Sequence, residues 1–379
     1  MRNSIIDNLR GLCLLGVIAI HIGSLALVPG EFSLYILLEV LSRYSVPTFF
    51  FISGYGLCAS DKALIKQDHL DYKNFLSTRF RSAGLPYLSW SFFYIFYFWL
   101  VLPAGSVSLN PKQIIFVLFF GLACYHLYFM VILLWFYAFY PLWRKIFCIF
   151  MQNRKKTLLW LLLIGQFAFN WWTTHHGLNP SEWQPILKNF FIYRLNYLPL
   201  HYLFIFMSGG FVALYWHKFI SFLRAHITLI TIFYFFSIML DIGSCYYSAS
   251  IERYDLMSIA NTYHQLSPQG LLYTIASILF FCLVLDWLEK YKVKGNNYAI
   301  TILNAIKLLS TNSMLIYFVH PLILDQLTNF YQRDGIVMTV KKVCFSYIIL
   351  VLISLIFSML LSKFYSHCKI LRLIFTGKK

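Results

Sequence analysis

Residues 10–21, Arg10-Gly-Leu-Cys-Leu-Leu-Gly-Val-Ile-Ala-Ile-His21, begin the first of a series of apolar runs that decide the fold of this chain. Arg10 and His21 are eleven residues apart, which at about 100° per residue is almost three whole helical turns. The two side chains therefore share one helix face. At about 1.5 Å of rise per residue, His21 lies roughly 16 Å deeper than Arg10, near the middle of a hydrocarbon core about 30 Å thick.

A histidine at this depth has two interpretations. It is either packed against a polar group of a neighbouring helix, or it takes part in function, which is the default hypothesis for an ionisable group inside a membrane. The presence of Arg10 on the same face favours the functional interpretation.

The composition predicts an all-α polytopic membrane protein. Of the 379 residues, 60% are hydrophobic and only 12% are charged, a balance far from that of soluble domains. Apolar runs long enough to cross a bilayer recur along the chain, so we expect about ten transmembrane helices in one domain, 1–379, with no appended soluble domain. The expected spans are 11–28, 34–58, 84–103, 114–142 (with a short interfacial helix at its start), 157–172, 197–217, 226–243, 268–286, 308–328 and 340–362.

The net charge of +17 reflects membrane topology and predicts no nucleic-acid partner. With a cytoplasmic N-terminus, 23 of the 31 Lys and Arg residues fall on the cytoplasmic side, which is a strong positive-inside pattern. An even number of spans then places both termini in the cytoplasm. The first run contains His21 and is followed by no small-residue cleavage site, so we expect it to remain in the mature chain.

Several site classes are disfavoured by the sequence. The eight cysteines are scattered, and they predict neither a disulfide framework nor a zinc site. The pair His175-His176 has no carboxylate or cysteine close by in sequence, so no metal is expected there. Inverted repeats with corresponding broken helices, which are typical of secondary transporters, are not visible.

Further polar side chains at membrane depth are candidates for supporting roles. Glu39 and Arg43 are four residues apart in the second span and can pair on one helix face. In the same span, Pro47 and the glycines of Ser53-Gly-Tyr55-Gly predict a kink and close packing. His126 and His320 lie toward the outer side, and each alone is better explained by packing than by catalysis. The cytoplasmic segment 60–83, ending in Arg79-Phe-Arg81, is either a topology-setting loop or the place where a polyphosphate binds.

Six segments together resemble the acyltransferase type 3 family of integral membrane O-acyltransferases, over nearly the whole chain. The first is the Arg, ten residues, His pattern of Arg10 and His21. Tyr128 departs from the tryptophan that the family has in its fourth-span motif. The other five segments are Pro47-Thr-Phe-Phe-Phe-Ile-Ser-Gly-Tyr55, Arg79-Phe-Arg81 with Pro86-Tyr87, His126-Leu-Tyr-Phe with Trp135 and Pro141, Tyr202 to Gly210, and Ser310 to Pro321 with its Tyr-Phe-Val-His-Pro ending.

This resemblance implies transfer of an acyl group, usually acetyl, from cytoplasmic acyl-coenzyme A to a carbohydrate hydroxyl. Acyl-CoA is then the donor substrate, no cofactor is bound permanently, and the partners are the acceptor glycan and membrane lipids. We expect Arg10, Arg79 and Arg81 to contact the CoA phosphates, because guanidinium groups suit phosphate oxygens. His21 is the expected general base. Ser53, Tyr55 or a backbone N–H near the kink is expected to stabilise the oxyanion, and Glu39 is an alternative partner that orients His21.

A different class of function stays open. The same intramembrane charges also suit a transporter or flippase of an isoprenoid-linked or acylated sugar, and a non-catalytic scaffold would leave the Arg10 and His21 pairing unexplained. The expected location is a cell membrane. The family resemblance implies that this is the bacterial cytoplasmic membrane.

Overall fold

A computed structural model of the chain describes residues 3–27, 31–61, 64, 69–103, 105–153, 156–175, 198–262, 265–334 and 339–378. These residues form helices and their connections, with no strand among them, as the composition predicts. His176 and much of the basic segment 62–68 lie outside the described residues. The chain divides into two compact units, unit 1 (Met1–Ala59, Phe167–His175 and Ile205–Met359) and unit 2 (Ser60–Gln166, His176–Phe204 and Leu360–Lys379).

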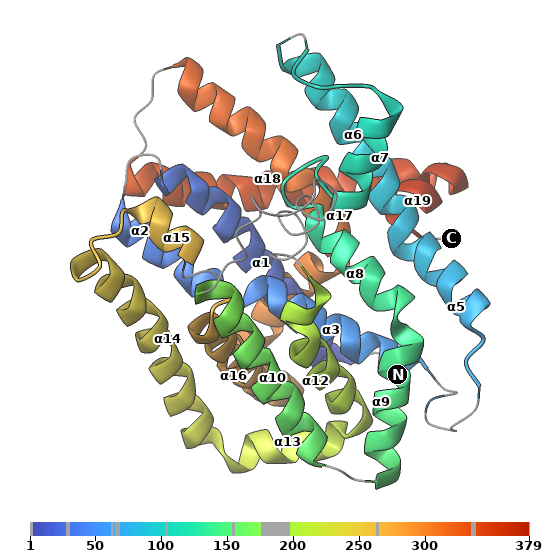
Figure 1. The fold of residues 1–379 in the computed structure, drawn as a ribbon, viewed down its shortest axis with the longest axis vertical. Coiled ribbons are helices and arrows are strands. Elements are labelled where there is room, and N and C mark those ends of the chain that lie inside the picture. The colour runs from blue at the N-terminus through green and yellow to red at the C-terminus, as the bar shows by residue number, and fades with distance from the viewer. Residues whose placement is uncertain are drawn as a thin grey trace. The chain divides into compact units, whose positions relative to one another are not determined.

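Unit 1 is built around the first helix, α1 (Ser4–Leu27), which runs without a break through the Arg10 to His21 segment (Figure 1). Its apolar side chains Leu14, Ile18 and Ile22 form a buried core with residues of α2, α17 and α18. The helices wholly or mainly in this unit are α1, α2 (Phe32–Leu38), the 3₁₀ turn η1 (Val40–Ser42), α3 (Ser45–Ser60), α12 (Leu203–Leu214), α13 (Trp216–Ala225), α14 (Ile227–Ser250), α15 (Leu256–Thr262), α16 (Pro268–Val293), α17 (Asn297–Arg333) and α18 (Val340–Ser366).

Helices α1 and α17 pack closely and run in the same direction. At one end, a Cβ added at Gly11 would lie 2.4 Å from the carbonyl oxygen of Ile306. At the other end, the rings of His21 and His320 stack with centroids 5.2 Å apart. Small residues allow helix backbones to approach in this way inside a membrane.

The predicted second span is interrupted, but before Pro47. The break covers Glu39 to Tyr44, between α2 and α3, and includes η1. Pro47 lies in the first turn of α3, where a missing backbone N–H costs no helical hydrogen bond. Close packing is found at Gly54, where an added Cβ would lie 1.9 Å from the carbonyl oxygen of Phe206 in α12.

Replacing Gly54 by Ala is expected to lower the free energy of unfolding by about 1–3 kcal/mol, the usual range for overpacking a close contact. The backbone of α12 leaves no room for the methyl group. The matched control is Gly56→Ala on the same helix, because an added Cβ there meets nothing within 4 Å. Denaturant titration of the purified protein in detergent measures both variants, and equal stability of the two would contradict the packing described here.

Unit 2 holds the remaining helices and the basic turn at Arg79 and Arg81. A π-helical turn, η2, joins α5 to α6, and the C-terminal helix α19 packs on both η2 and α6. A Cβ at Gly377 would lie 2.6 Å from the carbonyl oxygen of Ser82, and the Trp90 indole N–H donates to the carbonyl of Phe375 at 3.2 Å. The helices are α5 (Tyr72–Arg79), η2 (Phe80–Gly84), α6 (Leu85–Val101), α7 (Pro111–Phe120), α8 (Tyr128–Ala138), α9 (Tyr140–Asn153), α10 (Lys156–His175, shared with unit 1), η5 (Pro199–Tyr202) and α19 (Lys369–Thr376).

The described residues contain seven helices that are long and apolar enough to cross a membrane. The count rises to nine if each of two bent pairs, Tyr128–Ala138 with Tyr140–Met151 and Pro199–Leu214 with Trp216–Ala225, forms one span. The expected number was about ten, and the difference is the run 157–172, which forms α10 but is not among these candidates. The short helix expected at the start of the fourth span is α7, separated from α8 by the turn at 121–127.

Candidate active site

Helix α1 carries the two residues of the Arg, ten residues, His pattern. Because α1 is continuous, the rise of about 1.5 Å per residue separates Arg10 and His21 by roughly 16 Å along one face. The Arg10 side chain is 35% exposed and lies 3.9 Å from the Asp7 carboxylate, one turn earlier. Its guanidinium therefore remains accessible to an anion, whereas His21 is partly buried against α17.

His320 is the residue that the structure brings to His21. Its ring is fully buried, and its Nδ1–H donates to the carbonyl of Ile316 at 3.1 Å. The next residue, Pro321, has no backbone N–H, so it donates no helical hydrogen bond in this turn of α17. A neutral imidazole with its proton on Nδ1 presents Nε2 as an acceptor. The site therefore contains two stacked imidazoles on neighbouring helices, which the sequence placed in two separate spans.

Glu39 lies at the depth of His21 but against another face of α1. A Cβ added at Gly23 would lie 2.8 Å from Glu39 Oε1, so the carboxylate packs directly on the helix backbone there. Residues 21 and 23 are separated by about 200° around a helix. The geometry therefore gives no support to Glu39 as the group that orients His21.

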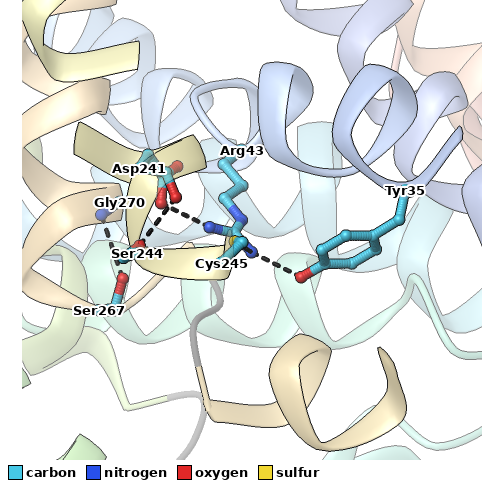
Figure 2. Close-up of polar contacts among 7 residues, drawn as sticks. All are labelled: Tyr35, Arg43, Asp241, Ser244, Cys245, Ser267 and Gly270. Atoms are coloured by element: carbon cyan, nitrogen blue, oxygen red, sulfur yellow. Dashed lines mark hydrogen bonds and ion pairs between the residues drawn. The ribbon is translucent and has the colours of Figure 1, made fainter. Parts of the chain in front are cut away.

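Arg43 pairs with Asp241 of α14, and not with Glu39 as the spacing in the second span suggested. Figure 2 shows the guanidinium between the Asp241 carboxylate, 2.5 Å from Nη1, and the Tyr35 hydroxyl, 2.7 Å from Nη2. The sulfur of Cys245 lies 3.8 Å from Nη2. Arg43 is 4% exposed and Asp241 is fully buried, so this is an internal ion pair. The break at Glu39 to Tyr44 changes the register of the span, which removes the helical spacing that would have joined Glu39 to Arg43.

The predicted seventh span, 226–243, would place Asp241 near its outer end, where water could reach the carboxylate, but the structure buries Asp241 fully. The helix does not end at residue 243 but continues to Ser250, so Asp241 lies well inside α14. A signal for the pairing was present in the sequence, because Asp241 is an isolated charge in an apolar span, and a buried charge requires a partner.

Tyr55 and Ser53 are not close to His21. The Tyr55 hydroxyl accepts a hydrogen bond from the Asn3 side chain at 2.9 Å, and Asn3 precedes α1. Asn3 lies 18 residues before His21, which is about 27 Å along a helix. The Ser53 hydroxyl donates to the carbonyl of Phe49 in its own helix at 2.8 Å. Because α3 runs antiparallel to α1, with Ser45 packed at Gly16, both candidates lie toward the Arg10 end.

In unit 2, the two arginines of the basic turn differ in their surroundings. Arg79 donates to the Ser60 hydroxyl at 2.9 Å, and its guanidinium lies over the rings of Phe75 and Tyr137 at 5.3 and 5.7 Å. Arg81 is exposed and donates to the Ser77 hydroxyl at 3.2 Å. A guanidinium has five N–H donors, so the exposed Arg81 has further donors to offer a phosphate.

His126 lies in the turn before α8. It is 1% exposed, and its ring contacts those of Tyr94 and Tyr125, with centroids 5.5 and 5.7 Å apart. Each candidate residue is thus placed within its own unit: His21 lies beside His320 in unit 1, and Arg79, Arg81 and His126 belong to unit 2.

A comparison with known protein families agrees with the order of the candidate residues along this helical chain. The family model described as "Acyltransferase domain", of acyltransferase type 3, matches residues 3–363. The chain belongs to the acyltransferase type 3 family. The resemblance found in the sequence motifs is therefore confirmed.

Two curated relatives of this acyltransferase-family chain come from Staphylococcus epidermidis, one of them from strain RP62A. Both are named "Probable poly-beta-1,6-N-acetyl-D-glucosamine export protein", and each is 26% identical over 268 residues. The matched region covers 70% of this chain and 66% of each relative, slightly less than two thirds of their length. No solved structure matches the chain.

Proposed function

We propose that this protein transfers an acyl group, acetyl in the simplest case, from cytoplasmic acyl-CoA to a hydroxyl of a cell-surface or lipid-linked carbohydrate. The observation that carries the proposal is the continuous helix α1, with an accessible guanidinium at Arg10 and an imidazole three turns deeper that stacks on His320. Family membership supports acyl transfer, and the names of the relatives support a carbohydrate acceptor.

In the proposed reaction, the acceptor oxygen attacks the thioester carbonyl while His21 takes the hydroxyl proton. The C–S bond breaks, the ester C–O bond forms, and the proton passes from the imidazolium to the CoA thiolate. A base with a reference pKa of about 6.5 suits this step near neutral pH. His320 is the proposed positioning residue, because its stacked ring fixes the plane of the His21 imidazole.

Arg10 is proposed to bind the phosphates of acyl-CoA. Arg79 and Arg81 are proposed as further phosphate contacts, and the surroundings of each arginine are considered separately. Arg10 and Arg81 offer accessible donors, whereas Arg79 is held by Ser60 and two aromatic rings. A bidentate guanidinium and phosphate contact is among the stronger polar interactions.

The Arg10→Ala variant is expected to weaken acyl-CoA binding about tenfold, consistent with loss of one charge-assisted hydrogen bond of about 1.5 kcal/mol. Titration of a non-hydrolysable acyl-CoA analogue into the detergent-purified protein measures the dissociation constant. The matched control is Lys341→Ala, an exposed cation that the topology places on the opposite side of the membrane. Unchanged affinity of the Arg10 variant would mean that this arginine contributes to membrane topology and does not bind acyl-CoA.

Export of a glycan without covalent change is the second candidate, because the two relatives are named as export proteins. Proteoliposomes loaded with labelled acetyl-CoA separate the two functions. A transferase leaves a base-labile labelled ester on the saccharide, whereas an exporter moves the saccharide across the sealed bilayer with its mass unchanged.

A further inference from the structure

Unit 2 contains a cavity of about 470 Å³, lined by the end of α6, the loop that follows it, α7 and the turn before α8. Ligand sites usually have volumes of about 300–1,000 Å³. The walls are held together by local contacts, since the Tyr87 hydroxyl of α6 donates to the Leu118 carbonyl of α7. Gly121 ends α7 with φ of 73°, a left-handed conformation that glycine adopts without strain.

The lining combines apolar and polar groups in the way that a sugar ring requires. Phe98 and neighbouring aliphatic side chains form an apolar wall, and Ser106, Ser108 and Gln113 supply two hydroxyls and an amide. The ring of Tyr125, 52% exposed, also faces the cavity. A pyranose has an apolar C–H face that packs on an aromatic ring, and its edge hydroxyls or acetamido group pair with amide and hydroxyl side chains.

The surroundings indicate water and not lipid. The loop residues Gly105, Ser106 and Ser108 are exposed, and so are Asn110 and Lys112 at the start of α7. The predicted topology places this loop on the outer side of the membrane, where a surface glycan is found. His126, whose ring contacts that of Tyr125, directly follows the cavity wall.

We propose that this cavity binds one N-acetylhexosamine unit of the acceptor glycan, with Gln113 on its polar edge and Tyr125 on its apolar face. The inference rests on the proposed function for the identity of the glycan. It is independent of the transfer chemistry, because none of the residues in this cavity takes part in the proposed reaction at His21.

Binding of a β-1,6-linked N-acetylglucosamine tetramer to the full chain in nanodiscs tests the proposal, by saturation-transfer NMR and calorimetry without acyl-CoA. Gln113→Ala and Tyr125→Ala are each expected to raise the dissociation constant at least about tenfold. Tyr125→Phe retains the ring and is expected to keep most of the affinity. Lys112→Ala, an exposed neighbour that does not line the cavity, is the matched control and is expected to bind as the wild type does.

The assignment is overturned if the tetramer does not bind to the wild type, or if Gln113→Ala and Tyr125→Ala both bind it with unchanged affinity. The glycan-binding proposal and the acyl-transfer proposal can be contradicted separately. Loss of tetramer binding in these variants, in a protein that forms no ester from acyl-CoA, would support the glycan site and contradict the proposed acyl transfer.

Discussion

The His21→Ala variant is expected to lose acyl transfer by about 10²- to 10⁴-fold, the range that a positioned general base contributes. In the proposed reaction the imidazole at this position takes the proton of the acceptor hydroxyl, and a methyl group has no lone pair with which to do so. Mass spectrometry of the saccharide, after incubation with acyl-CoA, measures the ester formed per unit time. Binding of acyl-CoA is expected to change little, because Arg10, the proposed phosphate contact on this helix, lies at the other end of α1.

The control for this variant is His226→Ala. His226 is an exposed histidine of unit 1 whose Nδ1–H donates to the Phe222 carbonyl of its own helical turn. Its loss is expected to leave the transfer rate unchanged. His320→Ala is expected to lower the rate by less than His21→Ala does, since the role proposed for His320 is to position the His21 ring. A wild-type rate in His21→Ala, with protein level and melting temperature preserved, would remove this imidazole from the mechanism.

The Asp241→Ala variant is expected to lose about 3–5 kcal/mol of unfolding free energy, the cost of breaking a buried ion pair from one side. The substitution leaves the Arg43 guanidinium in the protein interior without its carboxylate, while Tyr35 provides only a hydroxyl. Loss of the folded population, measured by size-exclusion chromatography and thermal unfolding in detergent, is the expected result.

The double variant Arg43→Met with Asp241→Leu distinguishes the effect of an unpaired buried charge on stability from the effect of lost side-chain packing. Replacing both charges by apolar side chains of similar volume is often neutral or stabilising, so this variant is expected to recover most of the lost stability. Asp334→Ala, at the exposed end of α17, is the control and is expected to stay within about 0.5 kcal/mol of the wild type. Equal stability of Asp241→Ala and the wild type would contradict the role given to this pair.

The sequence predicted those features that depend on local pattern. The continuous first helix, the shared face of Arg10 and His21, and the close approach at Gly54 all follow from helical period and residue size, and the structure agrees with each. Features that depend on distant partners were not predicted. Arg43 pairs with Asp241, which is 198 positions away, and His21 stacks on His320, which is 299 positions away. The residue spacing within one span reveals neither contact.

The interruption of the second span shows a further limit. Pro47 was expected to mark the kink, because proline breaks a helix interior. The break instead precedes it, at Glu39 to Tyr44, where the Arg43 side chain pairs with Asp241 of α14. Proline at the start of a helix is tolerated, and its effect depends on where the helix begins, which tertiary contacts decide.

The parallel pairing of α1 with α17 has a consequence for biosynthesis. The contacting positions of the two helices are nearly 300 residues apart in sequence, and at about 5–20 residues per second a ribosome needs roughly 15–60 s to make that length of polypeptide. During this interval the newly inserted first helix has no final neighbour on one side. A mutation that weakens its retention in the bilayer would therefore reduce the yield of assembled protein before any property of the finished fold is tested.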